Sequence, residues 1–140
     1  MGQQQLLLII LGVIVVGIAV AVGITMFQDN AVSANRDAVV NDLVNLAARA
    51  QQFYRRPTSL GGGQNSFLGL SGAGGISKLV NVPTSATSWN NANGTYTIQS
   101  AVDSFVTVQG LGNEIGNDGA AKVKVTMTVR ATSTVTTVDN

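Results

Sequence analysis

Side chains that could do acid–base or nucleophilic chemistry are few in this chain, and they are widely scattered. The 140 residues contain no histidine and no cysteine, and Glu114 is the only glutamate. Serine and threonine are abundant, but the histidine that commonly activates such a hydroxyl is missing. The aspartates show no paired spacing, and they are Asp29, Asp37, Asp42, Asp103, Asp118 and Asp139. We therefore predict that the protein is not an enzyme and has no catalytic residues.

Metal, cofactor and nucleic-acid sites are not predicted either. Without cysteine and histidine, disulfides and Cys/His zinc sites are excluded. The glycines at 69, 72, 74 and 75 do not form the dinucleotide-binding fingerprint, and loop flexibility explains them better. Eight basic and seven acidic side chains give a net charge of +1 and form no basic stripe, so no nucleic-acid partner is indicated.

One modification motif is present. Asn93-Gly94-Thr95 is an N-glycosylation sequon, which makes Asn93 a possible glycosylation site. Asn-Gly is also a common tight turn, and the turn is the favoured interpretation because such triplets often occur by chance.

The most informative element is the N-terminal apolar run. The first 28 residues carry no charged side chain, and residues 6–27 are almost continuously apolar. As a helix this run would be about 33 Å long, enough to cross a hydrocarbon core of about 30 Å. Charged residues make up only 11% of the chain, which is low for a freely soluble monomer. We infer a membrane or an equally dry environment, with much of the surface covered by further copies of the chain.

The helical pattern continues beyond the run and becomes amphipathic. Apolar residues recur at spacings of 4, 3, 4 and 3, and they are Val39, Leu43, Leu46, Ala50 and Phe53. Arg36, Asp37, Asp42, Arg49 and Arg55 fall off this stripe and are expected to face solvent. Pro57 predicts the stop near residue 56, so one helix is expected from Gln3 to Arg56. Glycines at 12, 17 and 23 should weaken it and allow local unwinding.

The C-terminal part predicts a loop-rich β head. Residues 58–95 are rich in Gly and Asn and predict a long connection, with one short helix or strand near 76–82. Period-two alternation then predicts strands around Tyr96 to Val102, Phe105 to Val108, Val123 to Val129 and Val135 to Val138. Residues 113–119 are expected to form a turn. The sheet should bury one face against the amphipathic half of the helix.

The predicted fold class is therefore α+β, a long N-terminal helix packed on a C-terminal antiparallel sheet. We divide the chain into an N-terminal helix at 1–56 and a head domain at 57–140. The helix has an apolar segment at 1–28 and an amphipathic half at 29–56.

This order of elements resembles the type IV pilins. In that family a short basic leader is removed, and about four residues separate the new N-terminus from a wholly apolar stretch. Met1 stands where the N-methylated first residue would be, and Leu6-Leu7-Leu8-Ile9-Ile10 matches the start of the apolar stretch. No basic residue precedes the run, which agrees with a removed leader. The similarity covers residues 1–56, whereas the head matches only in its general order of elements.

Two positions depart from the family pattern and indicate a divergent member. Pilins usually carry Glu at the fifth mature position, where the carboxylate is thought to attract the terminal amine of a neighbouring subunit. Gln5 can hydrogen-bond to that amine but cannot neutralise it. Many pilins also have a Pro near the place that Val22 occupies here.

The resemblance implies a filament subunit that polymerises through its N-terminal helix. Its partners would be further copies of itself, the prepilin peptidase and the inner-membrane assembly machinery, with storage in the cytoplasmic membrane before export to the cell surface. Small residues four apart, as at Gly17 and Ala21, permit close helix approach. The expected assembly contacts are Gln5, Leu6, Leu7, Ile10, Val13, Gly17, Ala21 and Gly23. The alternatives are a single-pass membrane anchor for an extracytoplasmic domain and a secretion-system pseudopilin.

Overall fold

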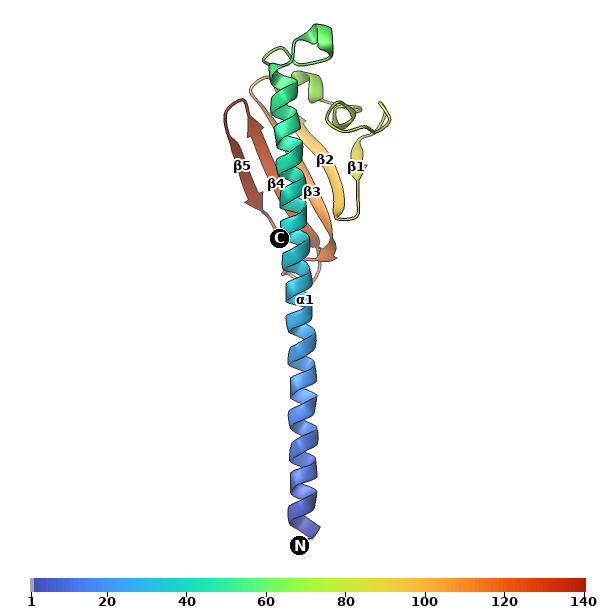
Figure 1. Cartoon of the computed structure of the whole chain (residues 1–140), viewed down its shortest axis with the longest axis vertical. Coiled ribbons are helices and arrows are strands. Elements are labelled where there is room, and N and C mark those ends of the chain that lie inside the picture. The colour runs from blue at the N-terminus through green and yellow to red at the C-terminus, as the bar shows by residue number, and fades with distance from the viewer. Residues whose placement is uncertain (1) are drawn as a thin grey trace.

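A single helix forms the long axis of the molecule (Figure 1). The computed structural model describes residues 2–140, and the helix, α1, spans Gly2–Arg55. Its 54 residues make a rod of about 80 Å. The single long helix expected from the apolar run and the amphipathic stripe is confirmed. It runs unbroken through Gly12, Gly17 and Gly23, and the local unwinding that these glycines permit is not seen in this structure.

The end of α1 is closed by the loop that follows it. Pro57 has φ −67° and lacks an N–H, so the helix cannot continue through it. The last carbonyls still need donors. Gly63 N–H donates to the Phe53 carbonyl at 2.8 Å, and Asn65 N–H donates to the Tyr54 carbonyl at 2.7 Å. The loop therefore folds back onto the helix end and fixes its own position.

Five antiparallel strands form one sheet in the order β1-β2-β3-β4-β5. Their bounds are Ser88–Asn90 for β1, Gly94–Ala101 for β2, Phe105–Ile115 for β3, Lys122–Arg130 for β4 and Thr134–Val138 for β5. The distal half of α1 lies across one face of this sheet, chiefly over β3 and β4 (Figure 1). The predicted fold class, a long N-terminal helix packed on an antiparallel sheet, is therefore correct.

The core lies between α1 and the sheet. All five residues of the predicted helical stripe are buried, and Ala47 joins them. They meet the inward-facing residues of alternate positions on β3 and β4, which are Val106, Val108, Val123, Val125, Met127 and Val129. Burying such side chains contributes about 1.5–3 kcal/mol each. The first residue of α1 to pack against this core is Val32, so the core is complete without the N-terminal part of the helix.

The helix approaches the sheet closely because glycines on β3 lie beneath it. A Cβ on Gly110 would come within 2.7 Å of a Val39 methyl carbon, and one on Gly112 within 2.1 Å of the Asn35 side-chain oxygen. Real side chains do not tolerate such contacts. These two glycines therefore set where α1 crosses the strand.

The connection from helix to sheet contains three short 3-10 turns, at Thr58–Leu60, Leu68–Leu70 and Ile76–Lys78. The last of these agrees with the short element expected near 76–82. The sequence pattern missed β1, which is only three residues long and pairs Trp89 with Tyr96. Their rings lie 5.0 Å apart and cover that edge of the core.

Two strand boundaries were predicted wrongly. β3 continues to Ile115, so residues 113–115 belong to a strand and not to the expected turn. The turn begins at Gly116, and the Asp118 carboxylate accepts the Ala120 and Ala121 N–H groups within it. β2 ends at Ala101, one residue before the predicted Val102, because the chain is already turning back toward Phe105.

Candidate functional site

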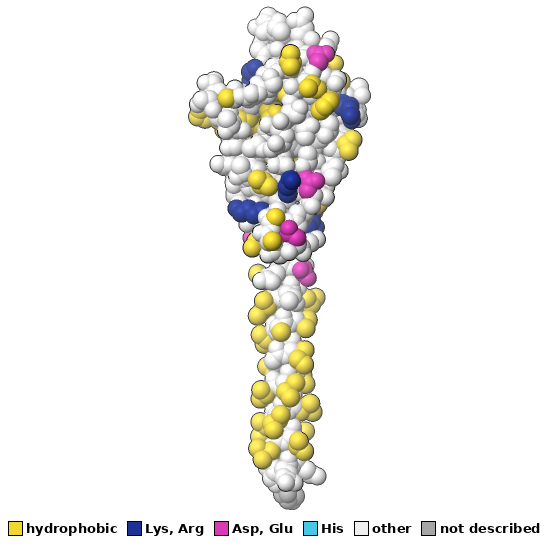
Figure 2. Space-filling model, turned by 180° about the vertical axis from the view of Figure 1, so that it is seen from behind, with side chains coloured by type: hydrophobic (Ala, Val, Ile, Leu, Met, Phe, Trp, Pro, Cys, Tyr) yellow, Lys and Arg dark blue, Asp and Glu magenta, His cyan; other side chains and the backbone are white. Residues whose placement is uncertain are grey.

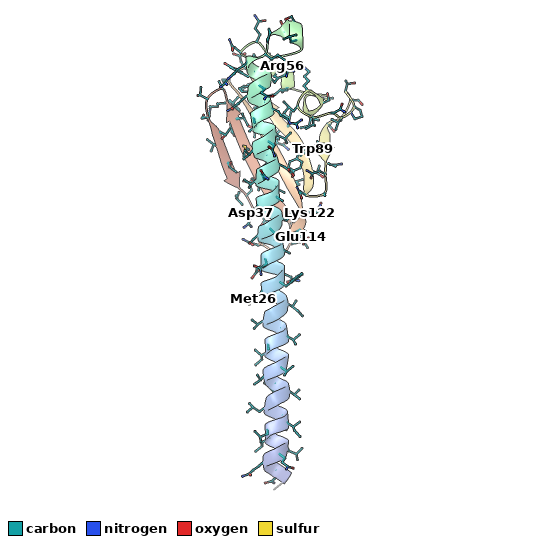
Figure 3. All side chains as sticks on the ribbon, in the orientation of Figure 1. Met26, Asp37, Arg56, Trp89, Glu114 and Lys122 are labelled. Atoms are coloured by element: carbon teal, nitrogen blue, oxygen red, sulfur yellow. The ribbon has the colours of Figure 1, made fainter. Side chains whose placement is uncertain are left out.

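The N-terminal part of α1 projects with no covering from the rest of the structure. We call residues 2–28 the stem and, from here on, residues 29–140 the head, because the second half of α1 belongs to the same core as the sheet. Every described side chain of the stem is exposed, as shown by Leu8 at 67% and Phe27 at 75%. Figure 2 shows hydrophobic side chains on both sides of the rod, and Figure 3 shows side chains pointing outward from it on both sides. The stem is long and apolar enough to cross a membrane. It is therefore an all-round apolar surface and not an amphipathic face.

The predicted assembly residues all lie on the stem and are all exposed. Because they all lie on one straight helix, they form a row along α1, and the fold of a single chain does not gather them into a compact site. Gly17 and Ala21 lie one turn apart. A Cβ added at Gly12, Gly17 or Gly23 would meet no atom within 4 Å. These glycines thus have no packing role inside the subunit. Met1, the predicted processing and methylation position, lies outside the described residues.

The structure reveals a polar cluster around Asp42 that the sequence pattern did not predict. One carboxylate oxygen of Asp42 accepts hydrogen bonds from Asn91 Nδ2 at 2.7 Å, Asn93 Nδ2 at 2.8 Å and the Tyr96 hydroxyl at 2.6 Å. Asp42 is half-buried, and so does not simply face solvent as its place off the helical stripe suggested. The cluster attaches the β1–β2 hairpin to α1.

Electrostatics in this cluster follow from burial and hydrogen bonding. Burial opposes ionisation of Asp42, but the hydrogen bonds from Asn93, Tyr96 and Asn91 outweigh it and hold the pKa of the carboxyl below its ordinary value. Burial, together with the hydrogen bond to Asp42, raises the pKa of the Tyr96 phenol. Both groups are therefore in their ordinary protonation states near neutral pH, and the cluster is suited to holding elements together.

Asn93, the possible glycosylation site, belongs to the same cluster. Its side-chain nitrogen donates to Asp42, and its backbone N–H donates to the Asn91 side-chain oxygen at 2.9 Å. It lies in the connection between β1 and β2, which is the turn favoured for this Asn-Gly pair.

Hollows occur on the surface at both ends of the head. One groove of about 690 Å³ lies where the stem enters the head, between α1 and the β3–β4 turn. Two shallower hollows of about 490 and 520 Å³ flank the distal end of α1 and are lined by Arg49, Arg55 and Arg56 among others. Within residues 2–140, no group of three or more His, Cys, Asp or Glu side chains is placed to hold a metal ion.

Comparison of the chain with protein-family models, curated proteins and solved structures gave no significant match.

Proposed function

We propose that this chain is the structural subunit of an extracellular, type IV pilus-like filament, in which many copies bundle their stems into a central apolar core. The observation that carries the proposal is the stem itself. It is a rod of about 40 Å, apolar on every side along residues 6–27, and it projects from a head whose core is complete without it.

The free energy available for assembly is large. About 25 cal/mol is gained for each Å² of apolar surface removed from water, and the stem exposes side chains along its whole length. Bundled stems would therefore supply tens of kcal/mol per subunit before the entropic cost of association. The open space at Gly17 and Gly23 supports close approach of neighbouring helices.

Before assembly, the same stem would hold the subunit in the cytoplasmic membrane. The resemblance to pilins adds a prepilin peptidase that removes a leader before Met1, methylation of the new amine, and inner-membrane machinery that extracts subunits into the filament. Gln5 would hydrogen-bond to the terminal amine of a neighbour in place of the ion pair that Glu provides in pilins.

Removal of detergent from the purified protein tests the proposal. The full chain should form regular filaments of uniform diameter that persist without lipid, as seen by negative-stain electron microscopy. A chain beginning at Gln28 should be a soluble monomer, because it keeps the whole core and loses the apolar stem.

A single-pass membrane anchor is the second candidate, since the stem is also long enough to cross a bilayer. An anchor would remain as single copies in detergent micelles and aggregate without order once detergent is removed. Disordered aggregates under every condition that preserves the head would favour the anchor. Finding this chain in filaments sheared from cells would favour a pilus subunit over a secretion-system pseudopilin.

A further inference from the structure

The charges of the head are divided between its two ends. We call the end of the head at which α1 stops the tip, and the opposite end, from which the stem projects, the base. Figure 3 shows Arg56 at the tip and Asp37, Glu114 and Lys122 at the base. The tip carries five basic side chains, Arg49, Arg55, Arg56, Lys78 and Arg130, and one acidic side chain, Asp103. Its net charge is therefore +4.

The base has the opposite sign. It carries six acidic side chains, Asp29, Asp37, Asp42, Glu114, Asp118 and Asp139. Its basic side chains number only three, Arg36, Lys122 and Lys124. The net charge of −3 follows from the topology, because α1 enters the head at the base, β4 starts there and β3 ends there. Two copies placed tip to base would bring opposite charges together, whereas tip-to-tip or base-to-base contacts would repel.

The groove at the base is lined by both apolar and acidic side chains. Phe27, Val32 and Ile115 supply the apolar surface, and Asp29 and Glu114 are the two acidic residues that line it. Phe27 and Ile115 are 75% and 54% exposed, so this surface is uncovered in the single chain.

The tip presents an exposed apolar side chain and a basic one, the opposite charge to the acidic residues of the groove. The loop at residues 57–63 raises Leu60, which is 69% exposed, next to the exposed Arg56. Two hydrogen bonds hold the loop: Gly62 N–H donates to the Pro57 carbonyl at 3.1 Å, and Gly61 N–H donates to the Thr58 carbonyl at 2.9 Å. Gly61 has φ 76°, a left-handed conformation that suits glycine. The backbone that carries Leu60 is therefore fixed before any partner arrives.

We propose that the tip loop of one copy, residues 57–63, seats in the base groove of the next copy along the filament. Leu60 would cover Phe27 and Ile115, and Arg56 would lie against Asp29 and Glu114. This inference rests on the proposed filament. The contact joins two different surfaces of the same chain, so it can repeat from copy to copy along an open helical polymer. Stacked heads would be offset along the axis by about 40 Å, the length of α1 from residue 29 to its end.

Paired cysteines test the contact directly, because the chain has none of its own. Leu60 and Ile115 lie at opposite ends of the head, separated by the length of β3, which is about 35 Å. A disulfide needs Cα atoms within about 7 Å, so a Leu60→Cys/Ile115→Cys chain can form one only between copies. Oxidised filaments of this variant should give a ladder of covalent oligomers on a non-reducing gel. A mixture of the two single variants should stop at dimers.

The control pair is Leu60→Cys/Val135→Cys, because Val135 is 51% exposed but lies on β5, away from the groove. Filaments that give no ladder, or an equal ladder from the control pair, would overturn the proposed contact but not the proposed filament. A wild-type chain that forms no filaments would overturn both.

Charge exchange gives an independent readout. Arg56→Glu or Glu114→Arg alone should lower filament yield about fivefold at low salt, and the double variant should recover it. Both side chains are exposed, so the head should fold in every variant. Equal yields for all three variants and the wild type would count against the contact.

Discussion

Asp42 concentrates three hydrogen bonds on a single carboxylate oxygen, and these are the only side-chain links that this residue makes among residues 2–140. Asp42→Ala would leave the Tyr96 hydroxyl and two amide groups without their acceptor. Hydrogen bonds to charged groups contribute about 1.5–3 kcal/mol, so we expect the free energy of unfolding to fall by about that amount. Urea denaturation of the head measures it. Asp37→Ala, on the exposed side of the same helix, is the matched control and should change stability by less than about 0.5 kcal/mol.

The Asp42 carboxylate should make the free energy of unfolding of the head depend on pH. Its pKa is lowered by folding, so its contribution is present above the unfolded value of about 4 and is lost as the pH falls through the folded value. Unfolding free energies should therefore drop below about pH 4, and Asp42→Asn should show a smaller drop. Asp118, whose pKa is also lowered by hydrogen bonds, accounts for part of the remaining acid sensitivity. A drop of equal size in wild type and variant would exclude Asp42 as a source.

At the residue scale, the sequence predicted what repeats locally and missed what depends on distant partners. Val39, Leu43 and Phe53 are spaced at the helical period, so their burial could be predicted. The role of Asp42 could not, because its partners lie 49–54 residues further along the chain. Only the Asn-rich turn hinted that polar side chains would gather there.

Glycines under the helix govern how closely α1 and β3 approach. Gly110→Ala would place a methyl group 2.7 Å from Val39 and about 3 Å from the Tyr96 ring, in a region with no exposed side to relax into. Overpacking of this kind costs about 1–3 kcal/mol. We expect a lower urea midpoint with an unchanged slope. Gly12→Ala, where the added methyl meets nothing within 4 Å, is the matched control.

Substitution of a glycine on the stem should impair assembly and not the folding of the subunit. Gly17→Leu adds a side chain in open space, so the subunit should fold normally with a slightly more stable helix. If neighbouring stems approach at this glycine, the leucine will hold them apart and reduce filament yield, as counted by electron microscopy. Val16→Leu adds apolar volume at an already branched position and should assemble normally. Full assembly of Gly17→Leu would show that stems do not meet at this position.

Element boundaries explain where the strand prediction succeeded and failed. The alternation of β4 is regular from Lys122 to Arg130, so its position was clear from the sequence. The predicted strand stopped at Val108 because Gly110 and Gly112 interrupt the apolar alternation, and Asn113 and Glu114 look like turn residues. They remain in the strand because the Asn113 and Glu114 N–H groups donate to the side-chain oxygen of Asn35 on α1. A helix residue thus extends a strand, and no local pattern can predict that.

At the scale of the whole molecule, the stem and the head should be separable. Val15→Asp places a carboxylate in the middle of the stem, where burial of the charge would cost several kcal/mol in each copy. We expect neither membrane insertion nor filaments, while the head unfolds at the wild-type urea concentration. Val15→Leu is the control for a change of size alone. Filaments of Val15→Asp at normal yield would mean that the stem is not buried in the polymer.

The whole-molecule arrangement was predicted in outline, since the apolar run, the amphipathic stripe and the strand alternation each have a clear period. The division of charge between tip and base was not. Asp29 and Glu114 are far apart in the sequence and meet at one groove only because β3 descends the full length of the head. Acidic and basic residues are interspersed along the sequence, and the fold places most of the acidic ones at the base and most of the basic ones at the tip.

The unbroken α1 also decides how the subunit would bear a pulling force. The strands run roughly along the helix axis (Figure 1), so tension applied through the stem loads the contacts between helix and sheet in shear. In that direction the buried side chains resist together, and no hairpin can be peeled open one hydrogen bond at a time. The same rod that carries the apolar stem therefore delivers mechanical load directly to the core, without a hinge along its length at which the subunit could yield first.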